Sequence, residues 1–205
     1  MSPAFDLFAA LEGRRSVRRF APRPVPGELV EEVLRAACLA PSPHGAMPWR
    51  FALVESAAAK ARLAEAMGRD FLRDMERDGV PEEERRRRHE ASLRLLKGAP
   101  LLLLASITLE GLDVYPDVAR QEAERTMAAQ SLGAALQNLM LAAYARGLGS
   151  LWRCAPLFCP ETVRRALELP ADHIPQALIL LGYPHPEWRP APKGAPAPSP
   201  QVLRR

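Results

Sequence analysis

One long helical pattern constrains the fold of this 205-residue chain more than any other feature. The helical spacing extends from about Val118 to Arg146, and Gly147 follows it as the predicted C-terminal cap. The apolar positions of its second half form one stripe: Leu132, Ala135, Leu136, Leu139, Met140 and Ala143. Apolar residues cover so much of the circumference there that this helix must be central or must pack against another subunit.

The remaining pattern predicts short strands separated by helices. Helices are expected at residues 2–13, between 27 and Pro41, at 57–97 with a break at 79–81, and at 160–169. Strands are expected at residues 49–54, 100–107, 148–154 and 176–183. The strand at 100–107 is apolar apart from Ser106, which is typical of a strand covered on both faces. Because the junctions lack a Gly-x-Gly-x-x-Gly turn, an α+β layered fold fits better than a nicotinamide-binding Rossmann domain.

Length and composition predict a single domain over residues 1–205, in which residues 185–205 form a proline-rich C-terminal arm. The chain has no run of eighteen uncharged apolar residues and no signal-peptide pattern at its start, so neither membrane insertion nor secretion is expected. Its three cysteines are too few and too scattered for a disulfide framework, which favours the reducing cytoplasm. Cys154 and Cys159 are expected to be small core residues, and no metal site is expected.

The net charge of +4 and the pI near 9.3 allow attraction to anions, including nucleic acid. The most basic run is 85–88, but the acidic run 82–84 precedes it. Acids three and four residues before arginines predict a solvated, self-paired helix face. No aromatic residues are interspersed in the run, so nucleic-acid binding is not expected.

Two short segments near the start of the chain suggest a site for an oxygen-rich anion. The segment Arg14-Arg15-Ser16-Val17-Arg18 follows Gly13, which ends a helical pattern. Guanidinium groups and a hydroxyl suit a phosphate or a planar anion, although a solvated helix end would show the same residues. The second segment, Pro41 to Trp49, is a proline-bounded loop that leads into a strand. Together they indicate a nucleotide-type cofactor site.

Four motifs in chain order resemble the nitroreductase family of FMN-dependent oxidoreductases: RRSVRRF, PSPHGAMPWRF, GLGSLW and LILLGYP. The segments FLRDMERDGVPEEERRRR and SLWRCAPLFCPETVRRALELPAD also resemble the nitroreductase-like domain of deazaflavin coenzyme biosynthesis enzymes. This resemblance covers essentially the whole chain. It implies a mixed, largely antiparallel sheet wrapped by helices, in an intertwined homodimer that holds FMN at the subunit interface.

The resemblance also assigns residues to the site. The residues that it implies for cofactor binding are Arg14, Arg15, Ser16, Arg18, Ser42, Leu148, Gly149 and Arg189, with Lys193 as a further cation. Among these, the cluster 14–18 would hold the phosphate, ribityl chain and pyrimidine oxygens of FMN, and Ser42 would reach the cofactor of the partner subunit. Asp74 and His44 are expected to contact substrate. The sequence departs from the family at Gly45 and Met47, where Asn and Gln are usual.

The implied activity passes a hydride from NADH or NADPH through the flavin to a conjugated acceptor such as a nitroaromatic or a quinone. Because the flavin carries this chemistry, no catalytic side chain is expected. Three alternatives stay open at this stage. They are a reductase or oxidase of a deazaflavin coenzyme or its precursor, an enzyme that cleaves flavin to make a cobalamin ligand, and a non-catalytic flavin- or nucleic-acid-binding module.

Overall fold

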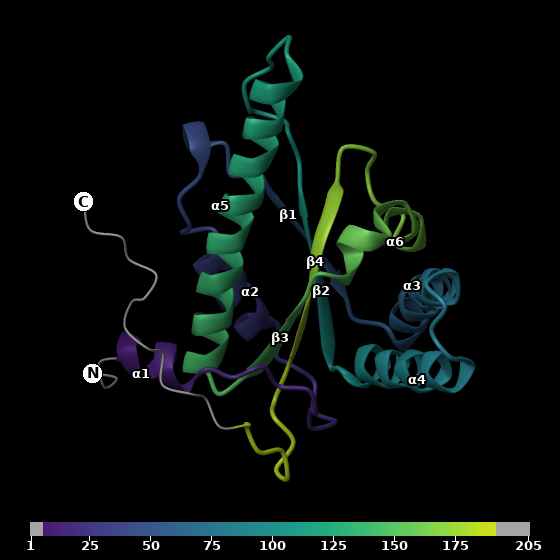
Figure 1. Cartoon of the computed structure of the whole chain (residues 1–205). Coiled ribbons are helices and arrows are strands. Elements are labelled where there is room, and N and C mark those ends of the chain that lie inside the picture. Colours follow the sequence, from purple (N-terminus) through teal and green to yellow (C-terminus); the bar gives the residue numbers. More distant parts are fainter. Residues whose placement is uncertain (1–5, 192–205) are drawn as a thin grey trace, which may run out of the picture.

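The computed structural model describes residues 6–191, which fold around a four-stranded sheet (Figure 1). The strand order is β1 (Trp49–Val54), β2 (Leu101–Ile107), β4 (Ile174–Gly182) and β3 (Gly149–Arg153), with every neighbouring pair antiparallel. Both faces of β2 are buried, as its apolar sequence predicts. In this strand order, β1 and β3 are the two edge strands of the sheet.

One face of the sheet packs against the long helix α5 (Val118–Ala145) and helix α2 (Gly27–Ala37). Figure 1 shows α5 standing beside the sheet along its length, with the short helix α1 (Leu7–Gly13) near its C-terminal end. The apolar stripe predicted for α5 lies in this core, because each of its residues is at most 4% exposed. Trp49 joins the same core.

The opposite face packs against a helical pair and helix α6 (Pro160–Ala166). The pair is α3 (Ala57–Arg77) and α4 (Glu82–Gly98), and it forms the right-hand side of Figure 1. Glu84 of α4 pairs with Arg87 and Arg88, so this part of the basic run is a self-paired solvated face, as predicted. Arg85 is half-buried and pairs with Glu76 of α3. Two single turns complete the fold, η1 (Pro43–Gly45) and η2 (Ala155–Phe158).

Three predicted helix boundaries were wrong. Helix α1 begins at Leu7 and not near residue 2, because the Asp6 carboxylate caps it by accepting the N–H of Phe8 at 2.9 Å. Helix α2 ends at Ala37, before Pro41, because residues 38–40 form a turn. Helix α6 is shorter than predicted, since Glu168 adopts a φ of 54°, which no helix accommodates. The predicted C-terminal arm is described only to residue 191, so Lys193 lies outside the described residues.

Gly147 ends α5 as the sequence predicts. Its φ of 73° is left-handed, its N–H donates to the Tyr144 carbonyl at 3.0 Å, and the Leu148 N–H donates to the Ala143 carbonyl at 2.9 Å. This is the Schellman arrangement, in which glycine avoids the penalty that a Cβ incurs. Leu148 and Gly149 follow directly, so this cap also sets where β3 begins.

We expect Gly147→Ala to destabilise the protein by about 1 kcal/mol in chemical unfolding, because alanine is strained at this φ. Gly98→Ala is the matched control. Gly98 also ends a helix, its φ is not positive, and an added Cβ would meet no atom within 4 Å. This second change should be neutral or stabilising by up to ~1 kcal/mol. Equal destabilisation by both substitutions would contradict the assignment of the cap.

Within residues 6–191, no helix combines the length and apolar character needed to cross a membrane.

Candidate functional site

The arginine segment 14–18 lies against the start of edge strand β3. The Val17 N–H donates to the Ser150 carbonyl at 2.9 Å, and Ser16 forms an isolated parallel bridge with Ser150. Val17 and Phe20 are buried in the core beneath the sheet, which fixes the backbone of the segment. The sequence thus alternates between anchors and exposed or half-buried arginines.

Gly149 permits this close approach. A Cβ on Gly149 would lie 2.5 Å from Cγ2 of Val17, closer than such atoms can pack. On the other side, the Tyr144 hydroxyl occupies the space where a Cβ of Gly13 would lie, so the end of α1 contacts the end of α5. Because of these two glycines, the end of α1, the end of α5 and the start of β3 pack closely around the arginines.

The arginines of this segment lack carboxylate partners. Among residues 6–191, Arg14, Arg15, Arg18 and Arg189 form no ion pair, whereas arginines elsewhere, such as Arg73 and Arg146, pair with acids. Arg15 donates to the carbonyls of Glu12 and Arg14, and its Nε is buried with no hydrogen-bond partner. Unpaired guanidinium groups and an unsatisfied buried donor are groups that suit a polyanion such as a phosphate.

A groove of about 140 Å³ lies among these residues. Its lining includes Arg14, Arg15, Leu148 and Gly149, and it also includes Trp188 and Pro190, which flank Arg189. Arg189 is exposed and donates to the carbonyls of Pro186 and Trp188, at 2.6 and 3.0 Å. The groove therefore gathers four of the eight residues predicted to bind the cofactor, and Ser16, Arg18 and Arg189 are close to its lining residues in sequence. The groove is smaller than the roughly 300 Å³ at which ligand pockets begin, so one chain encloses only part of such a ligand.

The predicted loop residues lie far from this groove. Ser42 precedes η1, and its hydroxyl accepts the N–H of Met47 at 3.1 Å. His44 of the same turn lies 3.8 Å from the carboxylate of Glu124, whereas the groove adjoins Tyr144 at the other end of α5. A helix rises 1.5 Å per residue, so Glu124 and Tyr144 are roughly 30 Å apart. Within one chain, the structure does not bring Ser42 and the arginine segment together.

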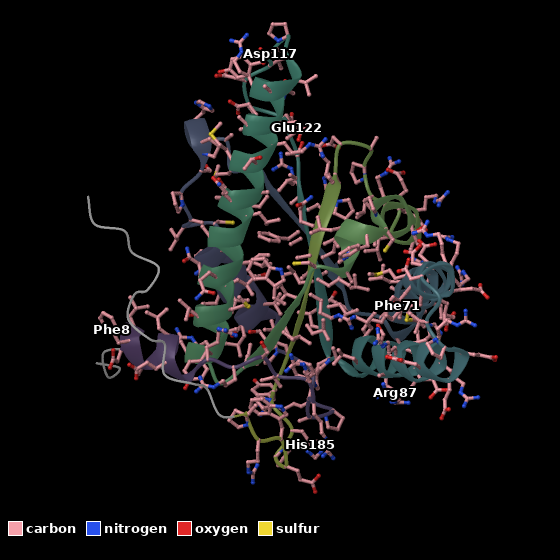
Figure 2. All side chains as sticks on the ribbon, viewed as in Figure 1. Phe8, Phe71, Arg87, Asp117, Glu122 and His185 are labelled. Atoms are coloured by element: carbon pink, nitrogen blue, oxygen red, sulfur yellow. The ribbon has the colours of Figure 1, made fainter. Side chains whose placement is uncertain are left out.

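The outer face of α5 runs from the region of His44 to the arginine groove and carries no charged side chain between them. No charged residue occurs between Thr126 and Ala145. One or two half-buried or exposed positions occur on each turn of this stretch, and one from each turn, Met127, Gln130, Ala134, Gln137, Leu141 and Tyr144, follows a spacing of three and four residues. Figure 2 shows the two ends of this face, with Glu122 near the N-terminal end of α5 and Phe8 of α1 near the other. An uncharged stripe of heptad-like spacing is a surface that suits a second helix.

A second, larger cavity of about 470 Å³ lies at the far end of β3. Its lining is mainly apolar and comes from α3, α4 and η2, including Phe71 and Phe158. Asp74 also lines it, although that carboxylate forms an ion pair with Arg77 at 3.4 Å. Asp74 thus faces a cavity, as a substrate-contacting residue would, but a different one from the arginine groove.

Sequence reasoning missed Arg153, the last residue of β3, which lines the larger cavity. Its guanidinium donates to the Ser92 hydroxyl at 3.3 Å and has no acidic partner among residues 6–191. Burial lowers the pKa of Arg153. Its position two residues after buried Leu151, on the same strand face, is the sequence signal that could have identified it.

The expectation that both cysteines near this cavity are core residues was wrong for Cys154, which is exposed where β3 gives way to η2. Cys159 is half-buried, and burial together with the charges of Asp70 and Asp74 raises its thiol pKa to about 11. Both thiols line the cavity. Cys38 is also free and exposed.

We expect iodoacetamide at pH 8 to alkylate Cys154 well before Cys159. The thiolate is the reacting form, and a pKa of about 11 keeps Cys159 protonated until the pH approaches that value. Peptide mass spectrometry over a time course, repeated at rising pH, measures both rates in one sample. Alkylation of Cys159 as fast as that of Cys154 at pH 8 would contradict the burial described.

These features define an α+β protein whose helix-wrapped antiparallel sheet presents an arginine-lined groove at one end of its edge strand. The model of the nitroreductase family matches residues 11–183. The chain is 34% identical to 5,6-dimethylbenzimidazole synthase of Rhodospirillum rubrum, over 90% of this chain and 88% of that protein. It is 31% identical to an NADH dehydrogenase of Thermus thermophilus, over 92% of each chain. Iodotyrosine deiodinase, crystallised with FMN and 3-iodo-L-tyrosine, superposes with a TM-score of 0.73 at 25% identity, over 97% of this chain and all of that one (100%).

The chain belongs to the nitroreductase family, whose members are FMN-dependent oxidoreductases. The resemblance and the α+β fold expected from the sequence are therefore confirmed.

Proposed function

We propose that this protein is a cytoplasmic FMN-dependent oxidoreductase that transfers electrons from NADH or NADPH to a conjugated acceptor such as a nitroaromatic or a quinone. The observation that carries this proposal is the groove of unpaired arginines at the start of β3. The family and the names of its relatives support the same reading. When bound, FMN would accept a hydride from the nicotinamide and reduce the acceptor.

In this proposal the chain binds and orients the cofactor. Arg14, Arg15 and Arg18 supply charge-assisted donors for the phosphate and the oxygens near it, and Arg189 closes on the same group. The hydroxyl of Ser16 lies in the same segment and supplies a further donor. No side chain is asked to act as a nucleophile or as a general base.

The larger cavity is a second candidate binding site. Its apolar lining fits an aromatic ring, and the desolvated guanidinium of Arg153 fits the oxygens of a nitro group or a quinone. Because this cavity is separate from the arginine groove, Arg153→Met should weaken the binding of such a compound to flavin-free protein while leaving FMN affinity close to that of the parent protein. Unchanged binding would discard Arg153 as a ligand-contacting residue.

The test of the activity is direct. Purified protein loaded with FMN should oxidise NADH or NADPH when a quinone or a nitroaromatic is supplied, and flavin-stripped protein should not. Both nicotinamides are titrated, because nothing in the described residues distinguishes them. A protein that takes up no FMN, or one that is loaded but shows no turnover with either nicotinamide, would overturn the proposal.

We also propose a homodimer in which the loop of one chain completes the groove of the other. Two observations support it: the turn that follows Ser42 lies beside Glu124, whereas the groove lies at the other end of α5, and the uncharged face of α5 runs between these two regions. A twofold dimer along α5 would place the partner's Ser42 near Arg14, because a twofold axis pairs opposite ends of the helix. Each groove, too small by itself, would then be closed by a second chain.

Mixing two inactive variants tests this arrangement. One carries Arg14→Ala and Arg15→Ala, and the other carries Ser42→Trp, which blocks the loop by size. After random re-association, about a quarter of all sites would pair an intact groove with an intact loop, because half of the dimers are mixed and each holds one such site. Recovery of about that share of FMN binding supports a shared site. No recovery, although mixed dimers form, would assign both parts to the same chain.

A second function is favoured by one comparison, the 34% identity to 5,6-dimethylbenzimidazole synthase. In that case the flavin would be consumed and not recycled. Incubating the protein with reduced FMN in air and searching for 5,6-dimethylbenzimidazole by mass spectrometry separates the two functions. Accumulation of that product with loss of FMN would favour the synthase, whereas intact FMN after many turnovers would favour the oxidoreductase.

A further inference from the structure

A buried carboxylate without a hydrogen bond lies beside two exposed potential metal ligands. Glu124 of α5 is 2% exposed, and its Oε2 has no hydrogen-bond partner. Such a burial is costly unless the charge is paired or coordinates a metal ion. Nothing in the activity proposed above uses this group.

Two side chains from other segments converge on Glu124. The Nε2 of His44 in η1 lies 3.8 Å from Oε1 of Glu124 and 3.9 Å from Oδ2 of Asp113, which is in the loop between β2 and α5. The three ligand atoms all lie within 4.8 Å of one another. Ligands of a tetrahedral Zn²⁺, bound at 2.0–2.1 Å, are roughly 3.3 Å apart. The exposed side chains of His44 and Asp113 can close that difference by small rotations.

The surroundings are also those of a cation site. The Tyr115 hydroxyl donates to Oδ2 of Asp113 at 3.3 Å, as groups that orient a ligand commonly do. Arg120 lies over the Tyr115 ring, but its guanidinium is paired with Asp117 at 2.5 Å. Its charge is thus paired elsewhere, and among residues 6–191 His44 is the one cationic side chain that lies beside both acids.

We propose that His44, Asp113 and Glu124 bind a divalent transition-metal ion of the Zn²⁺ type, with water completing the coordination. One imidazole and two carboxylates favour such an ion over Ca²⁺ or Mg²⁺, which take oxygen ligands alone. The ion joins three segments that are distant in sequence: η1, the β2–α5 loop and α5. It would hold the turn next to Ser42 in place. That positioning role rests on the proposed function, whereas the binding of the ion does not.

The test measures Zn²⁺ binding to untagged, flavin-free protein by calorimetry, with a metal count after dialysis. We expect one Zn²⁺ per chain and a rise of roughly 5–10 °C in melting temperature at a hundredfold excess over Kd. Each of His44→Ala, Asp113→Asn and Glu124→Gln should weaken the affinity at least about 10-fold, since even second-sphere changes cost that much. With Co²⁺ in place of Zn²⁺, the spectrum should lack thiolate bands, which excludes binding by the free cysteines.

Glu122→Gln is the matched control, because Glu122 lies on the same helix, is exposed and pairs with Arg125 (Figure 2). It should leave Zn²⁺ affinity unchanged. Asp113 is exposed, so Asp113→Asn keeps the test valid even if a change at buried Glu124 disturbs folding. Absence of Zn²⁺ binding, or binding that all three ligand variants retain, would overturn the proposal. Because the assay contains no flavin, either result is independent of whether the protein binds FMN.

Discussion

Replacing Arg14 and Arg15 together by alanine is expected to weaken FMN binding by roughly 100-fold. Each charge-assisted hydrogen bond contributes about 1.5–3 kcal/mol, and about 1.4 kcal/mol corresponds to a tenfold change in Kd. Neither guanidinium has a carboxylate partner within residues 6–191, so their removal leaves no acid uncompensated. Quenching of flavin fluorescence during titration of stripped protein measures the change.

The matched control is Arg86→Ala with Arg87→Ala on α4, which lowers the net charge by the same amount. These arginines are exposed on the helical pair, away from the groove; Figure 2 labels Arg87 there. The control should alter FMN affinity less than about threefold, through long-range attraction alone. If both double variants lose affinity equally, the cluster acts only through net charge, and the assignment of the phosphate to this groove is wrong.

Leu180→Ala is expected to destabilise the protein by about 3 kcal/mol, the largest stability effect of any single change considered. Leu180 is fully buried on the central strand β4, beneath the α3–α4 pair, and truncation leaves a cavity that a rigid sheet cannot refill. For a chain of this size the melting temperature should fall by roughly 6–12 °C. Denaturant unfolding followed by circular dichroism gives the free energy directly.

Leu53→Ala on β1 provides the comparison, since that leucine is 41% exposed. This change removes the same atoms but should lower the free energy of unfolding by less than about 1 kcal/mol, because the Leu53 side chain is partly exposed to water in the folded protein. Similar losses for Leu53→Ala and Leu180→Ala would mean that the sheet is not covered on the α3–α4 face as described.

The parts of the fold that local pattern determines were predictable from the sequence. The apolar run 101–105 of β2 requires cover on both faces, and the stripe of α5 together with Gly147 defines both the packing and the end of that helix. Helix ends that depend on capping were less predictable. The sequence offers two possible starts for α1, at Ser2-Pro3 and at Asp6. The hydrogen bond from the Phe8 N–H to Asp6, which the sequence alone does not show, places the start after Asp6.

The arginine groove was predictable because its donors are adjacent in sequence and lie beside a glycine that permits close packing. Arg153 was not, because its role depends on the cavity that α3, α4 and η2 build around it. The convergence of His44, Asp113 and Glu124 was also hidden, since no ligand spacing links positions so far apart in the chain. Ser42 illustrates the opposite limit. The resemblance places it at a flavin, whereas in its own chain it precedes the turn at the end of α5 opposite the groove.

The central claim, a flavin held between two chains, is tested most directly by sedimentation of the FMN-loaded protein while its visible flavin absorbance is recorded. The dimer predicts that the bound flavin moves with a species of twice the 22.6 kDa chain mass, and that dilution which separates the chains also releases the flavin. Flavin that sediments stably with a single 22.6 kDa chain would contradict it.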